Sequence, residues 1–207
     1  MRKEEWKYWK PWLLMALATW LTVSSTYAQI RYSRWMIQAA VGPSIDGEWV
    51  FSCAGQWNGY GQYGIRTEMR DWKYLSRSTP ADYQHGLCVL GDCAPRDHVY
   101  SFSAMLSKRW TLKQYWLETG LDAGPTALLR RELSFKANEA RGMFESNYLQ
   151  YHQTSFGAAA ALRAHIDWYP SRFWGCSVGV NTLFDKTVRM AFDFAIQFGY
   201  TKFKGRR

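Results

Sequence analysis

A histidine, a serine and a glutamate that could form a catalytic group lie close together in the sequence. His152 and Ser155 stand three residues apart in "YHQTSFG", and Glu145 precedes them. A serine that is activated by a histidine, itself oriented by an acid, is a nucleophile for acyl transfer. The alternative is that a loop histidine and a serine at the start of a strand simply face solvent. We adopt the solvent-facing interpretation and expect no catalytic site and no enzyme activity.

The four cysteines fall into two kinds. Cys88 and Cys93 flank "VLGD", so a short loop could close into a disulfide in an oxidising compartment. Cys53 and Cys176 lie in strand-like stretches, and we expect them to stay reduced. A four-cysteine zinc site needs close paired spacing at both ends, which the sequence lacks. Metal-spaced histidines and a glycine-rich phosphate loop are also missing, so we expect no cofactor and no metal.

Residues 1–28 have the order of a secretory signal peptide. A basic head, MRKEEWKYWK, is followed by the apolar stretch PWLLMALATWLTVS and then by SSTYA, which ends in a small residue. The apolar part is about 13 residues long, short of the roughly 20 that a membrane-spanning helix needs; an uncleaved anchor is the alternative. We expect cleavage after Ala28, which leaves residues 29–207 as a single domain.

The composition combines many aromatic residues with a polar average. Aromatic residues make up 17% of the chain and the formal net charge is +9, while the mean hydropathy is −0.37. A positive charge can indicate a nucleic-acid binder, but here the basic residues are scattered and the chain is exported. We therefore expect no nucleic-acid partner. Aromatic girdles around a hydrated interior fit this composition better.

Hydrophobic and polar residues alternate along the last part of the chain. In "RMAFDFAIQFGYTKF", residues 189–203, Phe192 and Phe194 share the even positions, whereas Asp193 and Gln197 share the odd ones. A period of two predicts a β-strand with one apolar and one polar face. Similar alternation runs through "RWMIQAAVG", "EWVFSCAGQW", "QYGIRTEMRDW", "HVYSFSAML", "WTLKQYWLETGLDAG", "TSFGAAAALRAHIDWYPS" and "RFWGCSVGVNTLF". The sequence therefore predicts eight strands.

The expected connections are short at one end of the strands and longer at the other. Short turns are predicted around Asn58, Lys108 and Pro170, and the two longest loops between residues 75 and 97 and between residues 123 and 152. Outer-membrane barrels have short periplasmic turns and longer external loops. The pattern therefore predicts an all-β fold, an eight-stranded antiparallel up-and-down transmembrane β-barrel with lipid as its surroundings.

Charged residues of both signs lie on the polar faces of these strands. Eight strands enclose an interior that is just wide enough for side chains to fill, so we expect a polar network in the lumen. Its predicted members are Arg66, Glu68, Arg70, Glu118, Arg163, His165, Asp167 and Asp193. A soluble barrel would instead place the apolar faces inside and these charges in water.

The strand pairs around "WYPSRFW" and "LSKRWTL", the alternating final strand and the signal peptide together resemble small outer-membrane β-barrel proteins of Gram-negative bacteria, especially those of Bacteroidetes. Two longer stretches, "GEWVFSCAGQWNGYGQYGIRTEMRDW" and "TSFGAAAALRAHIDWYPSRFW", are similar to the conjugative-transposon TraO family. The first resemblance implies an integral protein of the outer membrane. The second implies a part in a conjugative transfer apparatus, with other envelope or transfer-machinery proteins as partners.

Together these features predict a structural, binding or assembly role in the outer membrane. Loops held on a rigid scaffold are frequent recognition sites, and the predicted second long loop carries Arg130, Arg131, Glu132 and Lys136. Two alternatives stay open. Gly47-Glu48-Trp49 matches the Gly-x-Trp of lipocalins, secreted eight-stranded barrels that bind ligands, and the His152 group would suit a lipid-modifying outer-membrane enzyme.

Overall fold

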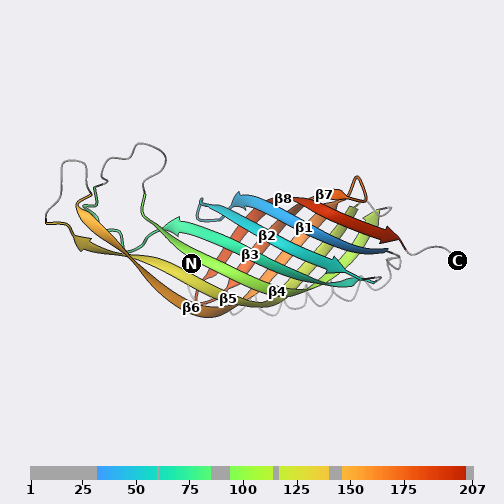
Figure 1. The fold of residues 1–207 in the computed structure, drawn as a ribbon, viewed down its shortest axis with the longest axis horizontal. Helices are drawn as coiled ribbons and strands as arrows, with labels where there is room; N and C mark the ends of the chain where they lie inside the picture. Colours follow the sequence, from blue (N-terminus) through green and yellow to red (C-terminus); the bar gives the residue numbers. More distant parts are fainter. Residues whose placement is uncertain (1–31, 60, 85–93, 114–116, 140–145, 204–207) are drawn as a thin grey trace, which may run out of the picture.

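The computed structural model describes residues 32–59, 61–84, 94–113, 117–139 and 146–203. In these ranges the chain forms eight strands that wind in order around a closed barrel (Figure 1). The strands are β1 (Tyr32–Pro43), β2 (Trp49–Asn58), β3 (Tyr63–Leu75), β4 (Arg96–Lys113), β5 (Leu117–Ala137), β6 (Tyr148–Trp168), β7 (Trp174–Phe184) and β8 (Val188–Phe203). The predicted signal peptide, residues 1–28, lies outside the described residues.

Every strand pairs antiparallel with its neighbours in the sequence, and β1 also pairs with β8. Trp35 of β1 lies opposite Trp57 of β2 on one side and opposite Tyr200 of β8 on the other. This last pairing closes the ring, so the barrel wall has no open edge. The predicted fold class, eight antiparallel strands in an up-and-down barrel, is confirmed.

Burial shows which face of each strand looks outward. On β8, Phe194 is 51% exposed, whereas its neighbours Asp193 and Ala195 are 4% and 1% exposed. The same alternation appears on β3, where Ile65 is exposed and Arg66 is buried. The apolar faces therefore cover the outside of the barrel and the polar faces line its interior. A soluble ligand-carrying barrel has the reverse arrangement, which is what the lipocalin alternative required.

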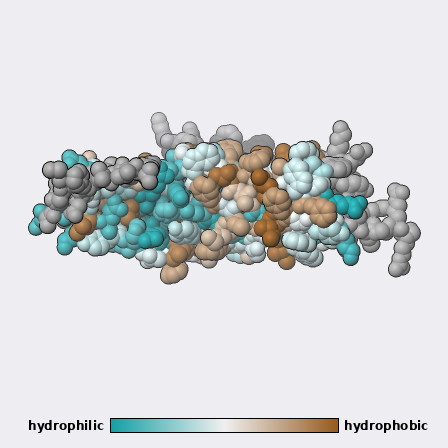
Figure 2. Space-filling view, turned by 45° about the horizontal axis from the view of Figure 1, so that its top comes forward, coloured by the Kyte–Doolittle hydropathy of each residue, from teal (hydrophilic) through white to brown (hydrophobic). Residues whose placement is uncertain are grey.

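Aromatic side chains gather on the outside near the end where β6 passes into β7. The rings of Trp168 and Trp174 meet edge to face with centroids 6.2 Å apart, and those of Phe173 and Tyr200 are 5.9 Å apart. The outer surface is apolar over the middle of the barrel, and the end that carries the β5–β6 hairpin is hydrophilic (Figure 2). An apolar band flanked by aromatic rings is typical of barrels that stand in a membrane.

The predicted turn around Lys108 is wrong, because β4 continues to Lys113. Lys108 and Arg109 occupy neighbouring strand positions and therefore point to opposite faces. The Lys108 amine lies 5.2 Å from the centre of the Trp110 ring and 5.8 Å from that of Tyr63, whereas Arg109 is fully buried in the lumen. Two adjacent cations are thus compatible with a strand when one extends along the aromatic surface and the other enters a polar interior.

The long loop predicted between residues 123 and 152 is also wrong in its bounds. β5 extends to Ala137 and β6 begins at Tyr148, and the two strands pair continuously from Leu117–Trp168 to Ala137–Tyr148. They form a hairpin that projects beyond the rest of the barrel (Figure 1). Arg130, Arg131, Glu132 and Lys136 are therefore strand residues of this hairpin. The other predicted long loop follows β3, which ends at Leu75, and leads to β4 at Arg96.

No helix among the described residues is both long and apolar enough to cross a membrane.

Candidate functional site

The inward-facing residues of a single strand pass through three layers of different chemistry. On β3, Arg66, Glu68 and Arg70 come first, Trp72 follows, and Tyr74 is last. The first three belong to a buried charged network, Trp72 to a layer of apolar side chains, and Tyr74 lines a pocket at the outer rim. β5 and β8 cross the same three layers: Asp122, Leu128 and Arg130 face inward on β5, and Asp193, Ala191 and Arg189 face inward on β8. β7 contributes Asn181 and Leu183 to the first two layers, and Asp185 of the turn that follows it lines the pocket.

The charged network fills the lower lumen. All eight residues predicted for it are buried, each at most 7% exposed. Glu68 accepts hydrogen bonds from Arg66 at 2.6 Å and from Arg70 at 2.7 Å. His165 lies between two carboxylates, with Nε2 3.3 Å from Asp167 and Nδ1 3.5 Å from Asp122. Further ion pairs are Arg66–Asp122, Arg163–Asp122, Arg163–Asp193, Arg70–Asp193, Arg34–Glu118 and Arg109–Glu118.

Asp122 and Arg109 are network residues that the sequence analysis missed. Asp122 is fully buried and lies 3.5 Å from Arg163 and 3.7 Å from Arg66. Continuing the alternation of Glu118 and Gly120 by one more step would have placed Asp122 on the same face. Arg109 was missed because its position was assigned to a turn. It lies 3.5 Å from Glu118, which also faces Arg34 at 3.4 Å.

A layer of apolar side chains closes the lumen above the network. Its buried members come from β2, β3, β4, β5, β7 and β8, and Tyr74, Ala159 and Ala161 pack against them. They are Val50, Trp72, Val99, Leu128, Leu183 and Ala191. Val99 and Ala191 have no exposed surface at all. Because buried apolar side chains pack without room for water, this apolar layer separates the charged network from the outer rim.

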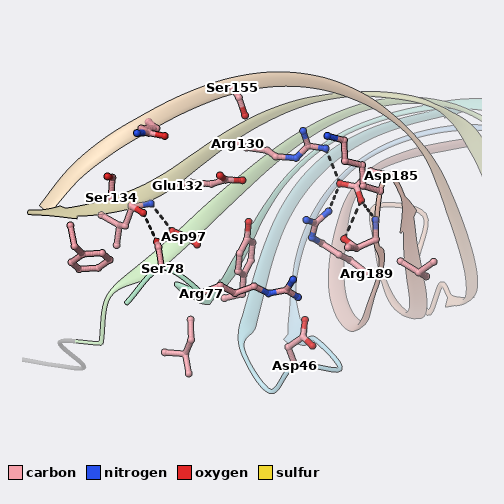
Figure 3. Close-up of a pocket in the computed structure, with 18 of the residues that line it drawn as sticks. Asp46, Arg77, Ser78, Asp97, Arg130, Glu132, Ser134, Ser155, Asp185 and Arg189 are labelled. Carbon is pink, nitrogen blue, oxygen red and sulfur yellow. Dashed lines mark hydrogen bonds and ion pairs between the residues drawn. The ribbon is translucent and has the colours of Figure 1, made fainter. Parts of the chain in front are cut away.

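A pocket of about 1020 Å³ opens at the outer rim above the apolar layer. The upper ends of β3, β4, β5, β6 and β8 contribute to its walls, together with the connections after β1, β3 and β7. Its charged lining residues are Asp46, Arg77, Asp97, Arg130, Glu132, Asp185, Lys186 and Arg189 (Figure 3). The pocket thus offers cations and carboxylates in equal number, which suits a polar ligand with groups of both kinds.

Asp185 is the centre of an ion cluster in one wall of this pocket. Arg130 from β5 donates to its carboxylate at 3.0 Å, and Arg189 from β8 makes a second ion pair with the same oxygen (Figure 3). The Thr187 main-chain N–H donates to the other oxygen at 2.6 Å. Burial alone would raise the pKa of Asp185, but these hydrogen bonds and the two guanidinium charges lower it to about 2. The cluster therefore stays ionised at neutral pH.

The β5–β6 hairpin is held to β4 and to the segment that follows β3 by contacts at Leu133. Its main-chain N–H donates to Asp97 at 2.7 Å, and its carbonyl accepts from the Ser78 hydroxyl at 2.5 Å. Farther out, Tyr83 meets the rings of Phe135 and Tyr148, with centroids 5.5 Å and 6.4 Å away. The hairpin is thus fixed at two positions along its length, which gives the pocket a defined wall.

Gly157 allows the Arg130 guanidinium to approach β6. A Cβ atom at position 157 would lie 2.9 Å from the Arg130 Nη1 atom and 3.3 Å from its Cζ. Arg130 extends across this glycine toward Asp185 on the β7–β8 turn, so any side chain at position 157 would compete with it for space. The absence of a side chain there is part of what positions the cluster.

The structure does not bring the candidate catalytic residues together. Ser155 lines the pocket, but His152 has the opposite strand parity and points to the other face of β6. Glu145 lies outside the described residues, as do Cys88 and Cys93. Cys53 and Cys176 are free thiols. Among the residues that the structure describes, no group of three His, Cys, Asp or Glu side chains is arranged to hold a metal ion.

No protein-family model matches the sequence, and no curated protein is significantly similar to it. Three solved structures that resemble the fold are Neisserial surface protein A, the N-terminal β-barrel domain of Pseudomonas aeruginosa OprF, and Yersinia pestis Ail crystallised with the heparin analogue sucrose octasulfate. The first has a TM-score of 0.51 at 9% identity and covers 82% of this chain and 96% of its own. The second has 0.48 at 8%, covering 82% and 98%, and the third 0.48 at 9%, covering 82% and 97%. At such low identity, the likeness to the Neisserial protein shows the fold alone: this chain is an eight-stranded antiparallel barrel of the transmembrane type.

Proposed function

We propose that the protein is an integral outer-membrane β-barrel that is exported by its signal peptide, is closed to solutes, and acts by binding at its outer rim. The observation that carries this proposal is the inverted distribution of side chains. Phe194, Val178 and Ile37 are each more than half exposed, whereas eight arginine–carboxylate ion pairs among the described residues are buried in the lumen. Exposing such a surface to water would cost a free energy of about 25 cal/mol for each Å² of apolar area. Lipid removes this cost.

A pore role is disfavoured by the contents of the lumen. Arg66, Arg109 and Arg163 are among the largest fully buried side chains, and each faces a carboxylate. The apolar layer then covers the network on the outer side. A solute would have to displace both layers to pass. The remaining site for an interaction is the rim, with its pocket and its projecting hairpin.

The proposed location is tested by fractionation. The mature protein should sediment with outer membranes, resist extraction by alkaline carbonate, and migrate differently on a gel before and after boiling, because folded barrels bind less detergent than unfolded chains. Recovery of the full mature chain as a soluble periplasmic monomer would refute the proposal.

Two further measurements separate binding from the other roles. Planar bilayers that contain the protein should show no steady conductance. Lipid A from cells with and without the gene should be identical, and a changed acyl pattern that is lost in His152→Ala would support an enzyme instead. A steady conductance would support a pore.

The resemblance to the TraO family makes a conjugative transfer apparatus a candidate setting for the rim. Its partners would then be other envelope or transfer-machinery proteins. Deletion of the gene should lower the mating frequency of a transposon that carries it, and complementation with an Arg130→Ala, Arg189→Ala rim variant should not restore it. Equal mating frequencies with and without the gene would exclude this setting.

A further inference from the structure

The upper part of β6 has a partner strand on one side only. β6 pairs with β5 along its whole length, from Tyr148 to Trp168, but with β7 only from Ala160 to Trp168. β7 ends at Phe184, opposite Ala160, and the chain then turns into β8. Residues 149–159 are therefore the free β6 edge, about 34 Å of strand at 3.4 Å for each residue. Figure 1 shows this part of the hairpin standing clear of β7.

The direction of the main-chain groups on this edge follows from the register. The Thr119 hydroxyl of β5 donates to the carbonyl of His165, so the odd-numbered residues of β6 turn their main chain toward β5. The β5–β6 register continues to Tyr148 without a bulge, and main-chain groups alternate between the two sides of a strand. The even-numbered residues therefore direct both N–H and C=O away from β5. On the free edge these are Gln150, His152, Thr154, Phe156 and Ala158.

No hydrogen bond to these outward main-chain groups is formed by any other part of the chain that the structure describes. The residues from Leu149 to Phe156 are exposed on both faces of the strand. Each unpaired group can still bond to water, so the edge is stable by itself. It is also a template on which another extended strand can form a complete ladder.

The side chains along the free β6 edge do nothing to prevent such pairing. Soluble proteins protect exposed edges with lysine, proline, bulges or inward-pointing charges. Between Tyr148 and Ala159 the sequence is YLQYHQTSFGAA, which contains no acidic or basic residue other than a histidine, and no proline. The β5 segment opposite, TALLRRELSFKA, contains Arg130, Arg131, Glu132 and Lys136. The charges of these two segments are thus confined to β5, which pairs with β4 as far as Arg131 and is hydrogen-bonded at Leu133 to Asp97 and Ser78.

We propose that the free β6 edge binds an extended, uncharged segment of a partner polypeptide by β-strand addition. This inference rests on the proposed function, because it places the hairpin outside the membrane. Main-chain hydrogen bonds would supply the affinity, and the outward side chains His152, Thr154 and Phe156 would contribute specificity. The partner is thus recognised by its extended backbone and not by a charged group.

A second copy of this chain in the same membrane does not fit the edge. Copies in one membrane are related by rotation about the membrane normal, so their β6 strands run in the same sense and the same residues meet at the same height. In a parallel pair, each residue that faces the other strand forms its two hydrogen bonds with the residues before and after the one opposite it. Two identical edges at the same height present the same even-numbered residues to each other, so the flanking residues direct their main-chain groups away and these bonds cannot form. The tilt of barrel strands makes the two edges cross as well. A separate polypeptide has no such constraint.

The test uses the full chain folded in phospholipid nanodiscs and two synthetic peptides. One has the sequence of residues 177–184, SVGVNTLF, which is uncharged and pairs with this same edge of β6 lower in the barrel; the other is N-methylated at alternate residues along its pairing edge. By amide hydrogen exchange, Gln153 and Ser155 should be protected in the free protein, and His152, Thr154 and Phe156 should not. The unmodified peptide should slow exchange at these three amides by about tenfold or more, and the methylated peptide should not.

Variants keep the test independent of side-chain effects. Thr154→Pro removes an outward N–H at a position where an edge strand tolerates proline, and it should weaken peptide binding about tenfold or more. Tyr151→Phe changes a side chain on the other face of β6 that does not line the pocket, and this variant should bind within about twofold of the wild type. The gel mobility of the unboiled protein shows that each variant is folded.

Four results would overturn the inference: protection of the even-numbered amides without peptide, no added protection with it, equal binding of the methylated peptide, or protection that grows with protein concentration alone. The last would assign the edge to a second copy. Fractionation tests the outer-membrane location independently, so failure of the proposed function and failure of this inference give different results.

Discussion

Arginine placed on the outer face of β8 tests which medium surrounds the barrel. Phe194 and Val188 lie on the same face of this strand and are each 51% exposed. Val188 is the first residue of β8, and Phe194 is near its middle, opposite Val41 and Val178. The same substitution at the two positions therefore differs mainly in depth.

The expected magnitudes follow from the distance between the two positions. Six residues at about 3.4 Å each make about 20 Å along the strand, and a strand tilt of about 45° reduces this to about 14 Å of depth. This is close to half of the roughly 30 Å hydrocarbon thickness. With Phe194 near the midplane, Phe194→Arg should lower the free energy of unfolding by about 2 to 4 kcal/mol, and Val188→Arg, near the interface, by at most about 1 kcal/mol.

The assay is reversible guanidinium unfolding in phospholipid vesicles, followed by tryptophan fluorescence and by gel mobility without boiling. The difference between the two variants is the decisive quantity, because it cancels general effects of an added charge. Equal effects at the two positions, or a Phe194→Arg protein within about 0.5 kcal/mol of the wild type, would show that the apolar outer face does not stand in lipid.

Three other perturbations address the lumen, the rim and the cysteines. Asp122→Asn should lower the free energy of unfolding by about 1 to 3 kcal/mol, because it removes one of the two carboxylates that form ion pairs with the buried guanidinium of Arg163 and leaves Asp193 as the other; a loss below about 0.5 kcal/mol in the same vesicle assay would contradict this. Since the pKa of Asp185 is lowered to about 2, its stabilisation is complete above about pH 4 and is lost between about pH 4 and pH 2, so Asp185→Asn should flatten the unfolding curve against pH in that window; an unchanged curve would refute the cluster. Peptide mass mapping of the secreted protein should find Cys88 linked to Cys93, and a link from either to Cys53 would contradict the predicted pairing.

How well each strand could be predicted from the sequence depends on whether its two faces meet different surroundings, such as lipid outside and the polar lumen inside. β8 was predicted residue by residue because Phe194 and Asp193 face opposite surroundings, and this contrast imposes a strict period of two. The hairpin beyond the barrel has water on both faces, so residues 149–156 show no such period, and those as far as residue 152 were assigned to a loop. The strand pairing that orders them is made by the main chain and has no signature in the side chains.

The rim pocket could not be predicted for a related reason. Arg130, Arg189 and Asp185 come from two strands and a turn that meet only when the barrel closes, and 55 residues separate Arg130 from Asp185. The lumen network was more accessible, since strand parity alone selects its members. Its omissions were Asp122, which lies in a predicted strand whose polar face was followed only as far as Gly120, and Arg109, which was assigned to a turn.

The apolar layer makes the rim and the lumen energetically separate modules. Substitutions in the Asp185 cluster and in the Asp122 network share no hydrogen-bond partner, because Trp72, Leu128 and Leu183 stand between them. Their effects on stability should therefore add, as they do for distant sites without common contacts. A barrel built in this way can change its binding surface in evolution without disturbing the charges that hold its strands together. For the same reason the barrel is a suitable scaffold for engineering, because residues of the rim can be replaced while the lumen network stays unchanged.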